Sequence, residues 1–510
     1  MSENNAAAEY GAEYNSAEYN DAEYNTASYG DTSPGDVSDF DVIVVGAGPV
    51  GENVADRTRA AGLTTAVVES ELIGGECSYW ACMPSKALLR PVAALADARA
   101  VAGSRQAVTG GLDVEAVLDR RDEFTSHWKD DGGVVWLGSI GAVLFRGHGR
   151  LVGERLVEVQ TPDGGRRRLR ARHAVALCTG TGALVPQLPG VAEAKPWTSR
   201  EATSAHKAPG RLVVVGGGVV GVEMATAWNA LGSEVTLLIR GSGPLPRMEP
   251  FVGELIAESL AEAGVKVRTG VNVAGLDRPA ADGPVTVLLD DGQRIVADEV
   301  LFAVGRTPRT EDLGLESIGL QPGSWLNVDD SCRVQAVDGD WLYAVGDVNS
   351  RALLTHQGKY QARMAGAAIG AIAHGTPLDT RPWGAHVATA DRLAVPQVVF
   401  SDPEAASVGM TADEAHRAGL RVQVVDYDLG QVAGASLYAD GYRGRARMIV
   451  DLDREVLLGV TFVGAGIGEL LHSATVAVVG EVPIERLWHA VPSYPTVSEI
   501  WLRLLETYRG

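Results

Sequence analysis

The chain has 510 residues, of which 46% are hydrophobic and 21% are charged, and its length predicts two to four domains of about 100–200 residues each. Its formal net charge of −21 repels phosphate, which excludes nucleic acid and anionic membranes as expected partners. Its four cysteines are too few for a secreted disulfide framework, and no apolar run reaches the roughly 18 residues of a membrane span.

The N-terminal segment, residues 1–39, repeats near-copies of "AEYN" and contains almost no aliphatic side chains. Such sequence cannot bury enough apolar surface to offset the entropy of ordering, so we predict a disordered low-complexity tail. A role in binding partners is the alternative interpretation. The segment is acidic and lacks the features of a secretory signal, so we expect a cytoplasmic protein.

A first dinucleotide-binding pattern begins at residue 40. The apolar run 42–45 predicts a buried parallel strand, and a second such run, "TTAVVE", ends at Glu69. Between them Gly46, Gly48 and Gly51 have the G-x-G-x-x-G spacing, followed by a helical stretch. In this fold the glycines let the backbone approach a pyrophosphate at the helix N-terminus, and the acid accepts a hydrogen bond from a ribose hydroxyl.

The next informative stretch, "GGECSYWACMPSKALLR", contains Cys77 and Cys82. Residues five apart in a regular α-helix have Cα atoms about 8–9 Å apart, too far for a disulfide, so a bonded pair requires a distorted segment. Pro84 is well placed to cause that distortion, and Lys86 could stabilise a thiolate at Cys82. A redox pair, structural or unpaired cysteines, and half of a metal site remain open at this point; a metal site lacks further Cys or His ligands nearby.

A second dinucleotide-binding pattern follows the apolar run 213–215, with Gly216, Gly218 and Gly221 at the same spacing and "EVTLLI" as the next strand. Two such folds in one chain imply two dinucleotides.

The two patterns differ after their second strands. The first ends in Glu69, which suits a free ribose 2′-hydroxyl, whereas the second is followed by Arg240 and then Arg247, which suit a 2′-phosphate. We therefore expect FAD in the first fold and NADPH in the second, with NADH possible. A solvated loop arginine is the alternative interpretation of Arg240.

Further along, the apolar run of "LYAVGDV" ends at Gly346 and Asp347 before a helix, which the aspartate could simply cap. After residue 385, strands joined by turns precede helical stretches, which predicts a third, α+β module. The predicted fold class is α/β, with two Rossmann-like dinucleotide-binding domains and a C-terminal α+β domain.

Residues 40–510 resemble the FAD-dependent pyridine nucleotide-disulfide oxidoreductases, the group of dihydrolipoamide dehydrogenase, glutathione reductase, mercuric reductase and soluble transhydrogenase. The motifs that carry the resemblance are "GAGPVG", "GGECSYWACMPSK", "CTGTGALVPQLPG", "GGGVVGVE", "AVGRTP", "YAVGDV" and "YPTVSE", in that order. The resemblance implies a split FAD-binding domain at 40–190 and 309–385, a nucleotide-binding domain at 191–308, and a dimerisation domain at 386–510 that makes a homodimer.

The resemblance also implies roles for individual residues. Cys77 and Cys82 would form the redox disulfide, with Cys82 next to the flavin, and Lys86 and Glu223 would pair near it. Asp347 would bind the ribitol chain, and His356 would lie by the pyrimidine edge of the flavin ring. The quoted motifs supply the remaining expected cofactor contacts: Gly75, Lys86, Thr179, Gly180, Gly305 and Gly346. Of the other cysteines, we expect Cys178 to be a buried small hydrophobe and Cys332 to have no chemical role.

The sequence departs from the family pattern near its C-terminus. Thiol-disulfide members carry a histidine base before "PT", and here Tyr494 occupies that position, although the glutamate that follows is present as Glu499. A tyrosine titrates near about 10 in water and makes a poor base at neutral pH. His489 could replace the base only through a rearranged loop. Glu499 has a second interpretation, as part of a T-x-x-E capping box with Thr496.

These features predict an enzyme that transfers electrons from NADPH through FAD and the disulfide to a small disulfide acceptor, with no metal. The alternative is an NAD(P)H:quinone oxidoreductase or a transhydrogenase-like flavoprotein, since transhydrogenase-like members also have tyrosine before "PT". A mercuric reductase is disfavoured, because the chain lacks a C-terminal cysteine pair. A non-enzymatic flavoprotein scaffold is a third, less favoured hypothesis.

Overall fold

The computed structural model describes residues 37–510, which divide into two compact units. The described part of unit 1 comprises residues 37–77, Ser126–Thr181 and Pro308–Ala388, and unit 2 comprises Ser78–Thr125, Gly182–Thr307 and Thr389–Gly510. The tail predicted for residues 1–39 lies outside the described residues, except for its last three, which begin the first strand.

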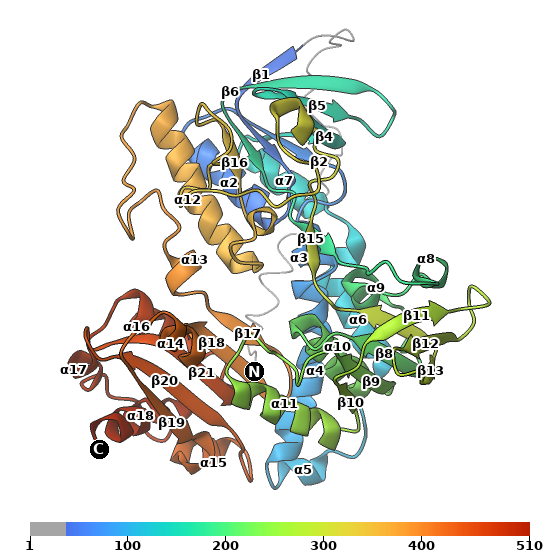
Figure 1. Cartoon of the computed structure of the whole chain (residues 1–510), viewed down its shortest axis with the longest axis vertical. Coiled ribbons are helices and arrows are strands. Elements are labelled where there is room, and N and C mark those ends of the chain that lie inside the picture. The colour runs from blue at the N-terminus through green and yellow to red at the C-terminus, as the bar shows by residue number, and fades with distance from the viewer. Residues whose placement is uncertain (1–36) are drawn as a thin grey trace, which may run out of the picture. The chain divides into compact units, whose positions relative to one another are not determined.

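Unit 1 is built on a seven-stranded sheet in the order β3-β2-β1-β6-β5-β4, with β16 also paired to β6 (Figure 1). The pairings of β1 with β2 and β6, of β2 with β3, and of β6 with β16 are parallel, and β4 and β5 form an antiparallel extension. The strands are β1 Val37–Val45, β2 Thr65–Glu69, β3 Val143–Arg146, β4 His148–Gly153, β5 Leu156–Gln160, β6 Arg166–Leu177 and β16 Leu342–Ala344.

Alternate side chains of β1 enter two cores of unit 1. Ile43 and Val45 belong to one cluster of buried side chains, and Val42 and Val44 to the other. Both faces of this parallel strand are therefore buried, as its continuous apolar run predicts. The helices are α2 Pro49–Ala60, α7 Asp131–Ser139 and α12 Thr355–Ala373, and the short 3₁₀ turns are Ser126–Trp128, Leu315–Ile318 and Asp347–Asn349.

The chain passes between the units five times. Three of the crossings fall within short elements, namely α3 Gly75–Tyr79, β7 Thr181–Ala183 and β15 Arg306–Pro308, and the other two follow Thr125 and Ala388. Strands β7 and β15 pair with each other. Cys77 is the last residue of the first segment of unit 1, and Ser78 begins unit 2.

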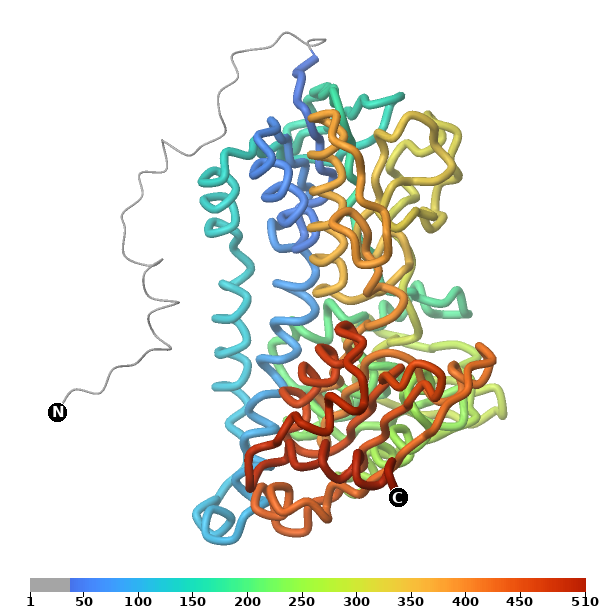
Figure 2. Tube along the Cα trace, turned by 90° about the vertical axis from the view of Figure 1, so that its left-hand side faces the viewer, coloured from blue at the N-terminus to red at the C-terminus, as the bar shows by residue number. Residues whose placement is uncertain are grey.

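Unit 2 contains a parallel sheet in the order β10-β9-β8-β14 and an antiparallel sheet in the order β11-β12-β13. Its strands are β8 Arg211–Val215, β9 Glu234–Ile239, β10 Lys266–Thr269, β11 Val273–Asp277, β12 Val285–Leu289, β13 Arg294–Ala297 and β14 Glu299–Phe302. The helices of this part are α4 Cys82–Ala100, α5 Ser104–Ala107, α6 Val114–Phe124, α8 Val191–Ala194, α9 Ser199–Ser204, α10 Val219–Ala230 and α11 Pro250–Glu262. Helices α4 and α6 run side by side (Figure 2).

The C-terminal part of unit 2 is an antiparallel five-stranded sheet in the order β17-β18-β21-β20-β19, packed against helices that include α16 and α18 (Figure 1). Its strands are β17 Gln397–Val399, β18 Glu404–Gly409, β19 Val422–Asp428, β20 Arg445–Asp451 and β21 Val456–Gly464. Its helices are α13 Ala390–Leu393, α14 Ala412–Arg417, α15 Ala433–Tyr438, α16 Leu471–Val479, α17 Ile484–Leu487 and α18 Ile500–Arg509, with 3₁₀ turns at Leu429–Gln431 and Val497–Glu499. The predicted fold class is confirmed, because two parallel sheets, each with a glycine turn between a strand and a helix, precede an α+β module.

Among the described residues, no helix combines the length and the apolar character that crossing a membrane requires.

Candidate functional site

The first glycine turn joins β1 to α2 in unit 1. Gly46 has φ +99°, and a Cβ added to it would lie 2.6 Å from the carbonyl oxygen of Cys178, the residue that follows β6. A Cβ on Gly51 would lie 1.8 Å from the carbonyl oxygen of Gly46. Gly48 is the N-cap residue of α2, so the turn presents bare backbone at the start of a helix. This is the geometry that binds a pyrophosphate.

Glu69, the last residue of β2, is fixed at this turn by two backbone donors. Its Oε2 accepts a hydrogen bond of 2.6 Å from the N–H of Ala47, and its Oε1 accepts one of 2.7 Å from the N–H of Glu71. Burial raises the pKa of Glu69, and the two N–H groups oppose that rise. The structure therefore places the predicted ribose acceptor beside the predicted pyrophosphate turn.

The surroundings of this turn fit FAD. A Cβ on Gly75 would lie 2.9 Å from the Cα of Gly48, so two loops meet through glycine backbone alone. The Oγ1 atom of Thr179 is buried without a hydrogen-bond partner among the described residues, and Gly180, which follows it, has φ +67°. Buried polar atoms are usually hydrogen-bonded, so this hydroxyl is suited to a polar group of a bound ligand.

The segment that the sequence predicts as the second part of the FAD-binding domain carries Gly346 and Asp347. A Cβ on Gly346 would lie 2.9 Å from the side chain of Val50, and the Oδ2 of Asp347 accepts a hydrogen bond of 2.8 Å from the Thr181 hydroxyl. Asp347 does not cap α12, because that helix begins at Thr355 with Leu354 as its N-cap residue. The capping interpretation of Asp347 is therefore wrong. His356 lies exposed in the first turn of α12.

The second glycine turn joins β8 to α10 in unit 2 and repeats the first. Gly216 has φ +115°, and its Cβ would lie 2.3 Å from the carbonyl oxygen of Ala303. A Cβ on Gly221 would lie 1.9 Å from the carbonyl oxygen of Gly216, and Gly218 is the N-cap residue of α10. Both predicted glycine turns thus have a shape that only glycine permits.

The two candidate 2′-phosphate ligands follow β9. Arg240 comes directly after its last residue, and Arg247 lies in the loop before α11; both are exposed. Neither side chain makes an ion pair or hydrogen bond with another residue that the structure describes, so both are available to an anion. Gly305, with φ +148°, accepts a backbone hydrogen bond of 2.9 Å from Leu184.

The cysteine segment is not one regular helix. Cys77 lies in α3, Cys82 is the first residue of α4, and Ala81 between them has φ −134° and ψ −97°. Pro84 sits in the first turn of α4, where its missing N–H costs nothing but its ring prevents the helix from continuing toward Cys77. The predicted distortion is therefore present. Both cysteine side chains are half-buried.

Lys86 and Glu223 are brought together in unit 2 from α4 and α10. The Nζ of Lys86 lies 2.8 Å from Oε2 of Glu223, whose side chain is only 4% exposed. The other oxygen, Oε1, accepts a hydrogen bond of 3.1 Å from the N–H of Phe400, and Nζ lies 5.0 Å from the centroid of the Phe400 ring. The lysine is thus held one helical turn after Cys82 by a buried carboxylate.

Around Trp80, which lies between the two cysteines in the sequence, the structure shows contacts that the sequence did not indicate. The guanidinium of Arg200 lies 4.1 Å from the centroid of the Trp80 indole, and the Thr203 hydroxyl donates a hydrogen bond of 3.0 Å to the Trp80 carbonyl. Both belong to α9. Arg121, fully buried, donates to the carbonyls of Thr203 and Ala205 at 2.5 and 3.1 Å. Helix α9 therefore holds the turn in front of Cys82.

The C-terminal loop presents Tyr494 with 76% of its surface exposed. Glu499 is buried and forms an ion pair of 2.5 Å with Arg503, while its Oε2 has no hydrogen-bond partner among the described residues. The capping-box interpretation of Thr496 and Glu499 is wrong, because the Thr496 hydroxyl donates to the carbonyl of Ser493 and makes no cap hydrogen bond.

The three remaining candidates are two cysteines and a histidine. Cys178 and Cys332 are buried, and burial raises the pKa of the Cys178 thiol. His489 is exposed after α17, and its side chain makes no hydrogen bond with the residues that the structure describes. Within residues 37–510, no group of three or more His, Cys, Asp or Glu side chains is arranged to hold a metal ion.

Comparison with known proteins places these features in a family context. Residues 40–371 match the family model described as pyridine nucleotide-disulphide oxidoreductase, and residues 395–504 match that of its dimerisation domain. The chain is 32% identical over 467 residues to dihydrolipoyl dehydrogenase of Thermus scotoductus, which covers 90% of this chain and 95% of that protein. It is 28% identical over 462 residues to a mercuric reductase of Staphylococcus aureus. That match covers 90% of this chain and 80% of the mercuric reductase.

Solved structures agree with these matches at the level of the fold. The HOCl-induced flavoprotein disulfide reductase RclA of Escherichia coli has a TM-score of 0.76 at 24% identity, covering 91% of this chain and 99% of that one. LpdA of Mycobacterium tuberculosis has a TM-score of 0.77 at 24% identity, covering 92% of this chain and 99% of that one.

Proposed function

Because the chain belongs to the FAD-dependent pyridine nucleotide-disulphide oxidoreductases, which are enzymes, we propose that it uses NADPH to reduce a small disulfide through Cys77 and Cys82. The observation that carries this proposal is the placement of Cys82 as the first residue of α4, with Lys86 one turn later in a 2.8 Å ion pair with Glu223. A helix N-terminus and a fixed ammonium group both stabilise negative charge on a sulfur.

When bound, FAD would supply two-electron redox chemistry between the nicotinamide and the disulfide of Cys77 and Cys82. The residues suited to holding it in unit 1 are the glycines of the first turn, Glu69, Gly75, Thr179 with its unsatisfied hydroxyl, and Asp347.

The chain's own chemistry is a thiol-disulfide exchange. Two electrons and two protons convert the protein disulfide into the thiols of Cys77 and Cys82. A thiolate of this pair then attacks the acceptor disulfide, one acceptor thiol leaves, and the second cysteine displaces the other, which restores the protein disulfide.

The redox pair is tested by counting thiols in the FAD-loaded protein. Adding NADPH without oxygen should make two more cysteines per chain accessible to an alkylating reagent, and mass spectrometry should find the label on Cys77 and Cys82. Cys178 and Cys332, which are buried, should stay unlabelled in both states. Labelling that does not change with NADPH would overturn the proposal.

The preference for NADPH rests on Arg240 and Arg247, which are exposed and have no carboxylate partner among the described residues. A charge-assisted contact contributes about 1.5–3 kcal/mol, or very roughly tenfold to a hundredfold in affinity. Replacing both arginines with alanine should raise the KM for NADPH by that factor and leave the KM for NADH nearly unchanged. Equal wild-type efficiency with the two nucleotides would contradict this assignment.

A second candidate function, reduction of a quinone or dye, is favoured by Tyr494, which is exposed where thiol-disulfide members have a histidine base. General base catalysis contributes about 10²–10⁴-fold, and electron transfer to a quinone needs no such base. Tyr494→His should raise disulfide turnover without changing quinone turnover. His489→Ala checks the remaining base, since loss of disulfide turnover in that variant would assign the role to His489.

We also propose that the protein is a homodimer. Residues 395–504 match a dimerisation domain, and within this range the large side chains of Val476, Val491 and Tyr494 are 54%, 87% and 76% exposed. Surface of this kind is covered when a second copy packs against it.

A further inference from the structure

The loop that carries Arg247 ends at a buried carboxylate, Glu249. This residue is 2% exposed and directly precedes α11, yet its side chain does not cap that helix. Its Oε1 accepts a hydrogen bond of 2.7 Å from the N–H of Ala412, and its Oε2 lies 2.7 Å from Nη1 of Arg447. A buried charge is costly unless it is paired, so these two contacts fix the end of the loop.

Both partners of Glu249 belong to the C-terminal part of unit 2, in the range that matches a dimerisation domain. Ala412 is the first residue of α14, and Arg447 lies on β20. Side chains of a strand alternate between its two faces, and the neighbours Ala446 and Met448 are in the core of the C-terminal part. Arg447 therefore points out of that core, toward the residues that precede α11.

The guanidinium group of Arg447 is itself held on two sides. Asp426, which is opposite it on β19, accepts hydrogen bonds from its Nε at 2.7 Å and its Nη2 at 2.8 Å. These hydrogen bonds raise the pKa of Arg447, so the group stays charged. The guanidinium also lies 5.3 Å from the centroid of the Phe251 ring on α11. A rigid, planar group held in this way presents Nη1 to Glu249 in one orientation.

A second anchor lies on the other side of Arg247. The N–H of Leu245 donates a hydrogen bond of 2.8 Å to the carbonyl of Gly217, in the second glycine turn. Leu245 and Met248 are buried, whereas Arg247 is exposed. The backbone is thus fixed two residues before and two residues after Arg247, while its side chain stays accessible to a ligand.

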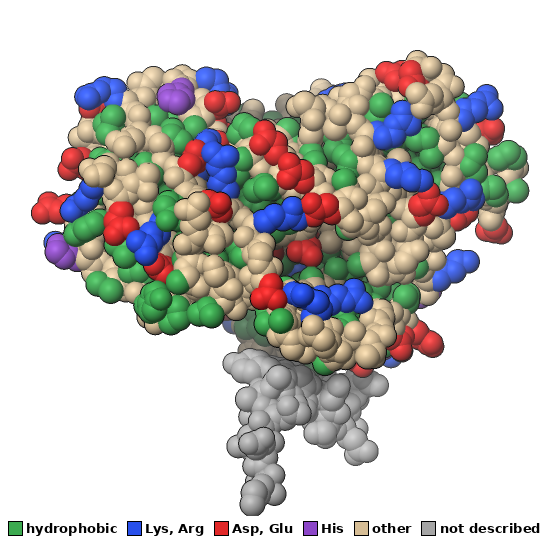
Figure 3. Space-filling model, turned by 90° about the horizontal axis from the view of Figure 1, so that it is seen from below, with side chains coloured by type: hydrophobic (Ala, Val, Ile, Leu, Met, Phe, Trp, Pro, Cys, Tyr) green, Lys and Arg blue, Asp and Glu red, His purple; other side chains and the backbone are tan. Residues whose placement is uncertain are grey.

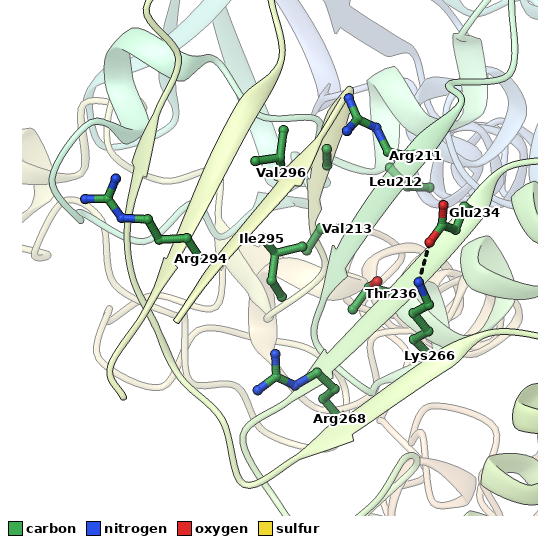
Figure 4. Close-up of a pocket in the computed structure, with 11 residues that line it drawn as sticks. Arg211, Leu212, Val213, Glu234, Thr236, Lys266, Arg268, Arg294, Ile295 and Val296 are labelled. Atoms are coloured by element: carbon green, nitrogen blue, oxygen red, sulfur yellow. Dashed lines mark hydrogen bonds and ion pairs between the residues drawn. The ribbon is translucent and has the colours of Figure 1, made fainter. Parts of the chain in front are cut away.

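The same parallel sheet carries other cations at its opposite end. Figure 4 shows the ion pair of Lys266 with Glu234, which are the first residues of β10 and β9. Arg211, the first residue of β8, forms an ion pair of 2.6 Å with Asp298. Arg240 follows the last residue of β9, so six residues of strand, or about 20 Å, separate it from Glu234. These paired cations therefore do not contribute to an anion site beside Arg240.

We propose that Arg447 is a positioning residue for nucleotide specificity: through Glu249 it holds the loop that presents Arg247 to the 2′-phosphate of NADPH. This inference rests on the proposed preference for NADPH. A loop that is already ordered binds more tightly, because no ordering cost arises on binding. NADH lacks the 2′-phosphate, so its binding does not depend on where Arg247 lies.

The test measures the Kd of NADP⁺ and of NAD⁺ by isothermal titration calorimetry of the FAD-loaded, oxidised protein. Arg447→Met keeps an unbranched side chain and removes its charge. It should raise the Kd of NADP⁺ at least about threefold, but no further than Arg247→Ala does, and leave the Kd of NAD⁺ unchanged. Added to Arg247→Ala, it should weaken NADP⁺ binding no further, because the loop then has no arginine to position.

The matched control is Arg443→Met. Arg443 also joins the C-terminal part to α11, but through an exposed ion pair with Glu262, the last residue of that helix. This variant should leave both dissociation constants unchanged. Glu249→Gln guards against misfolding of Arg447→Met, because its amide still accepts from Ala412 while the ion pair is lost. It should show the same selective weakening of NADP⁺ binding.

Three results would overturn the proposal. Equal weakening of NADP⁺ and NAD⁺ binding by Arg447→Met, or weakening of NADP⁺ binding by Arg443→Met to the same extent, would mean a general loss of structure. Unchanged NADP⁺ binding in Arg447→Met and Glu249→Gln, beside weakened binding in Arg247→Ala, would remove the role of Arg447 and leave the NADPH preference intact. A wild type that binds NADP⁺ and NAD⁺ equally would contradict both.

Discussion

Glu223 shows how a single buried carboxylate organises its surroundings. One oxygen faces the ammonium group of Lys86 at 2.8 Å and the other accepts from the backbone of Phe400. A buried charge costs several kcal/mol unless it is paired, so the lysine is required by the carboxylate as much as by any chemistry at Cys82.

Lys86→Met should therefore lower the free energy of unfolding by about 3 kcal/mol, because it leaves the Glu223 carboxylate without a counter-charge. Urea denaturation of the FAD-loaded protein measures this loss. Converting both partners to apolar residues (Lys86→Met, Glu223→Leu) should recover part of it. The control is Arg443→Gln, which breaks the exposed pair of Arg443 with Glu262 and should cost at most about 1 kcal/mol. Equal losses in Lys86→Met and Arg443→Gln would show that burial has no part in the effect.

Glu52, in the first turn of α2, is a second residue whose environment makes a prediction. Burial raises its pKa to about 7; Lys359 opposes the rise and Glu69 adds to it. An acid whose pKa is higher in the folded than in the unfolded chain contributes stability at low pH that is lost as the pH rises through the folded value. Here that loss begins near the ordinary glutamate value of 4.5 and is complete slightly above the folded value of about 7.

Glu52→Gln stays neutral throughout this range. Its melting temperature should match the wild type near about pH 4, exceed it increasingly up to about pH 7, and keep a constant difference above that. Thermal unfolding across this pH series measures the difference, with Glu154→Gln, at an exposed position in unit 1, as a control whose difference should stay flat. A Glu52→Gln difference that is independent of pH would contradict the account.

At the scale of elements, helix α15 sets the position of the C-terminal loop. Gly434, in its first turn, is so close to this loop that an added Cβ would lie 2.0 Å from the carbonyl carbon and 2.3 Å from the carbonyl oxygen of Thr496. These are backbone atoms, so they cannot rotate away as a side chain could. The loop that carries Tyr494 and Glu499 is therefore positioned by a contact that requires glycine.

Gly434→Ala should displace this loop, lower stability by about 1–3 kcal/mol, and change turnover of the disulfide substrate more than that of a quinone. Thermal unfolding and steady-state assays of both reactions measure the two effects. Gly111→Ala, at a position where a Cβ meets nothing within 4 Å, is the control and should behave as the wild type. If the two variants behave alike, α15 does not position this loop.

The elements also show how far sequence reasoning reaches. The apolar runs at 42–45 and 213–215 predict β1 and β8 because strands buried on both faces need continuous apolar residues, and the glycine turns follow because no other residue fits there. The contacts of α9 with Trp80 were not predicted, since they join residues about 120 positions apart in the sequence. The capping box that the T-x-x-E pattern predicts is wrong, because Glu499 pairs with Arg503 on the helix that follows it.

For the whole molecule, the net charge of −21 does not mean a uniformly acidic surface. Acidic and basic side chains are interspersed on the face shown in Figure 3. Many are in ion pairs of the kind that contributes less than about 1 kcal/mol each when exposed. Arg240 and Arg247 differ, because neither side chain forms an ion pair with another described residue. Local charge balance, not net charge, therefore decides where an anion can bind.

The proposed homodimer gives the last prediction. Among residues 37–510, Val491 is the most exposed of the large apolar side chains, at 87%, and it lies three residues before Tyr494 in the range that matches a dimerisation domain. If a second copy covers this loop, Val491→Glu places an unpaired charge in the interface, which costs several kcal/mol and should weaken the dimer at least about a hundredfold. Sedimentation velocity over a dilution series measures this, with Val152→Glu as the control, because that residue is 38% exposed on β4 and gains the same charge. Val152→Glu should remain dimeric. If Val491→Glu dissociates at the same concentrations as the wild type, the loop that carries Tyr494 lies outside the interface between the two copies.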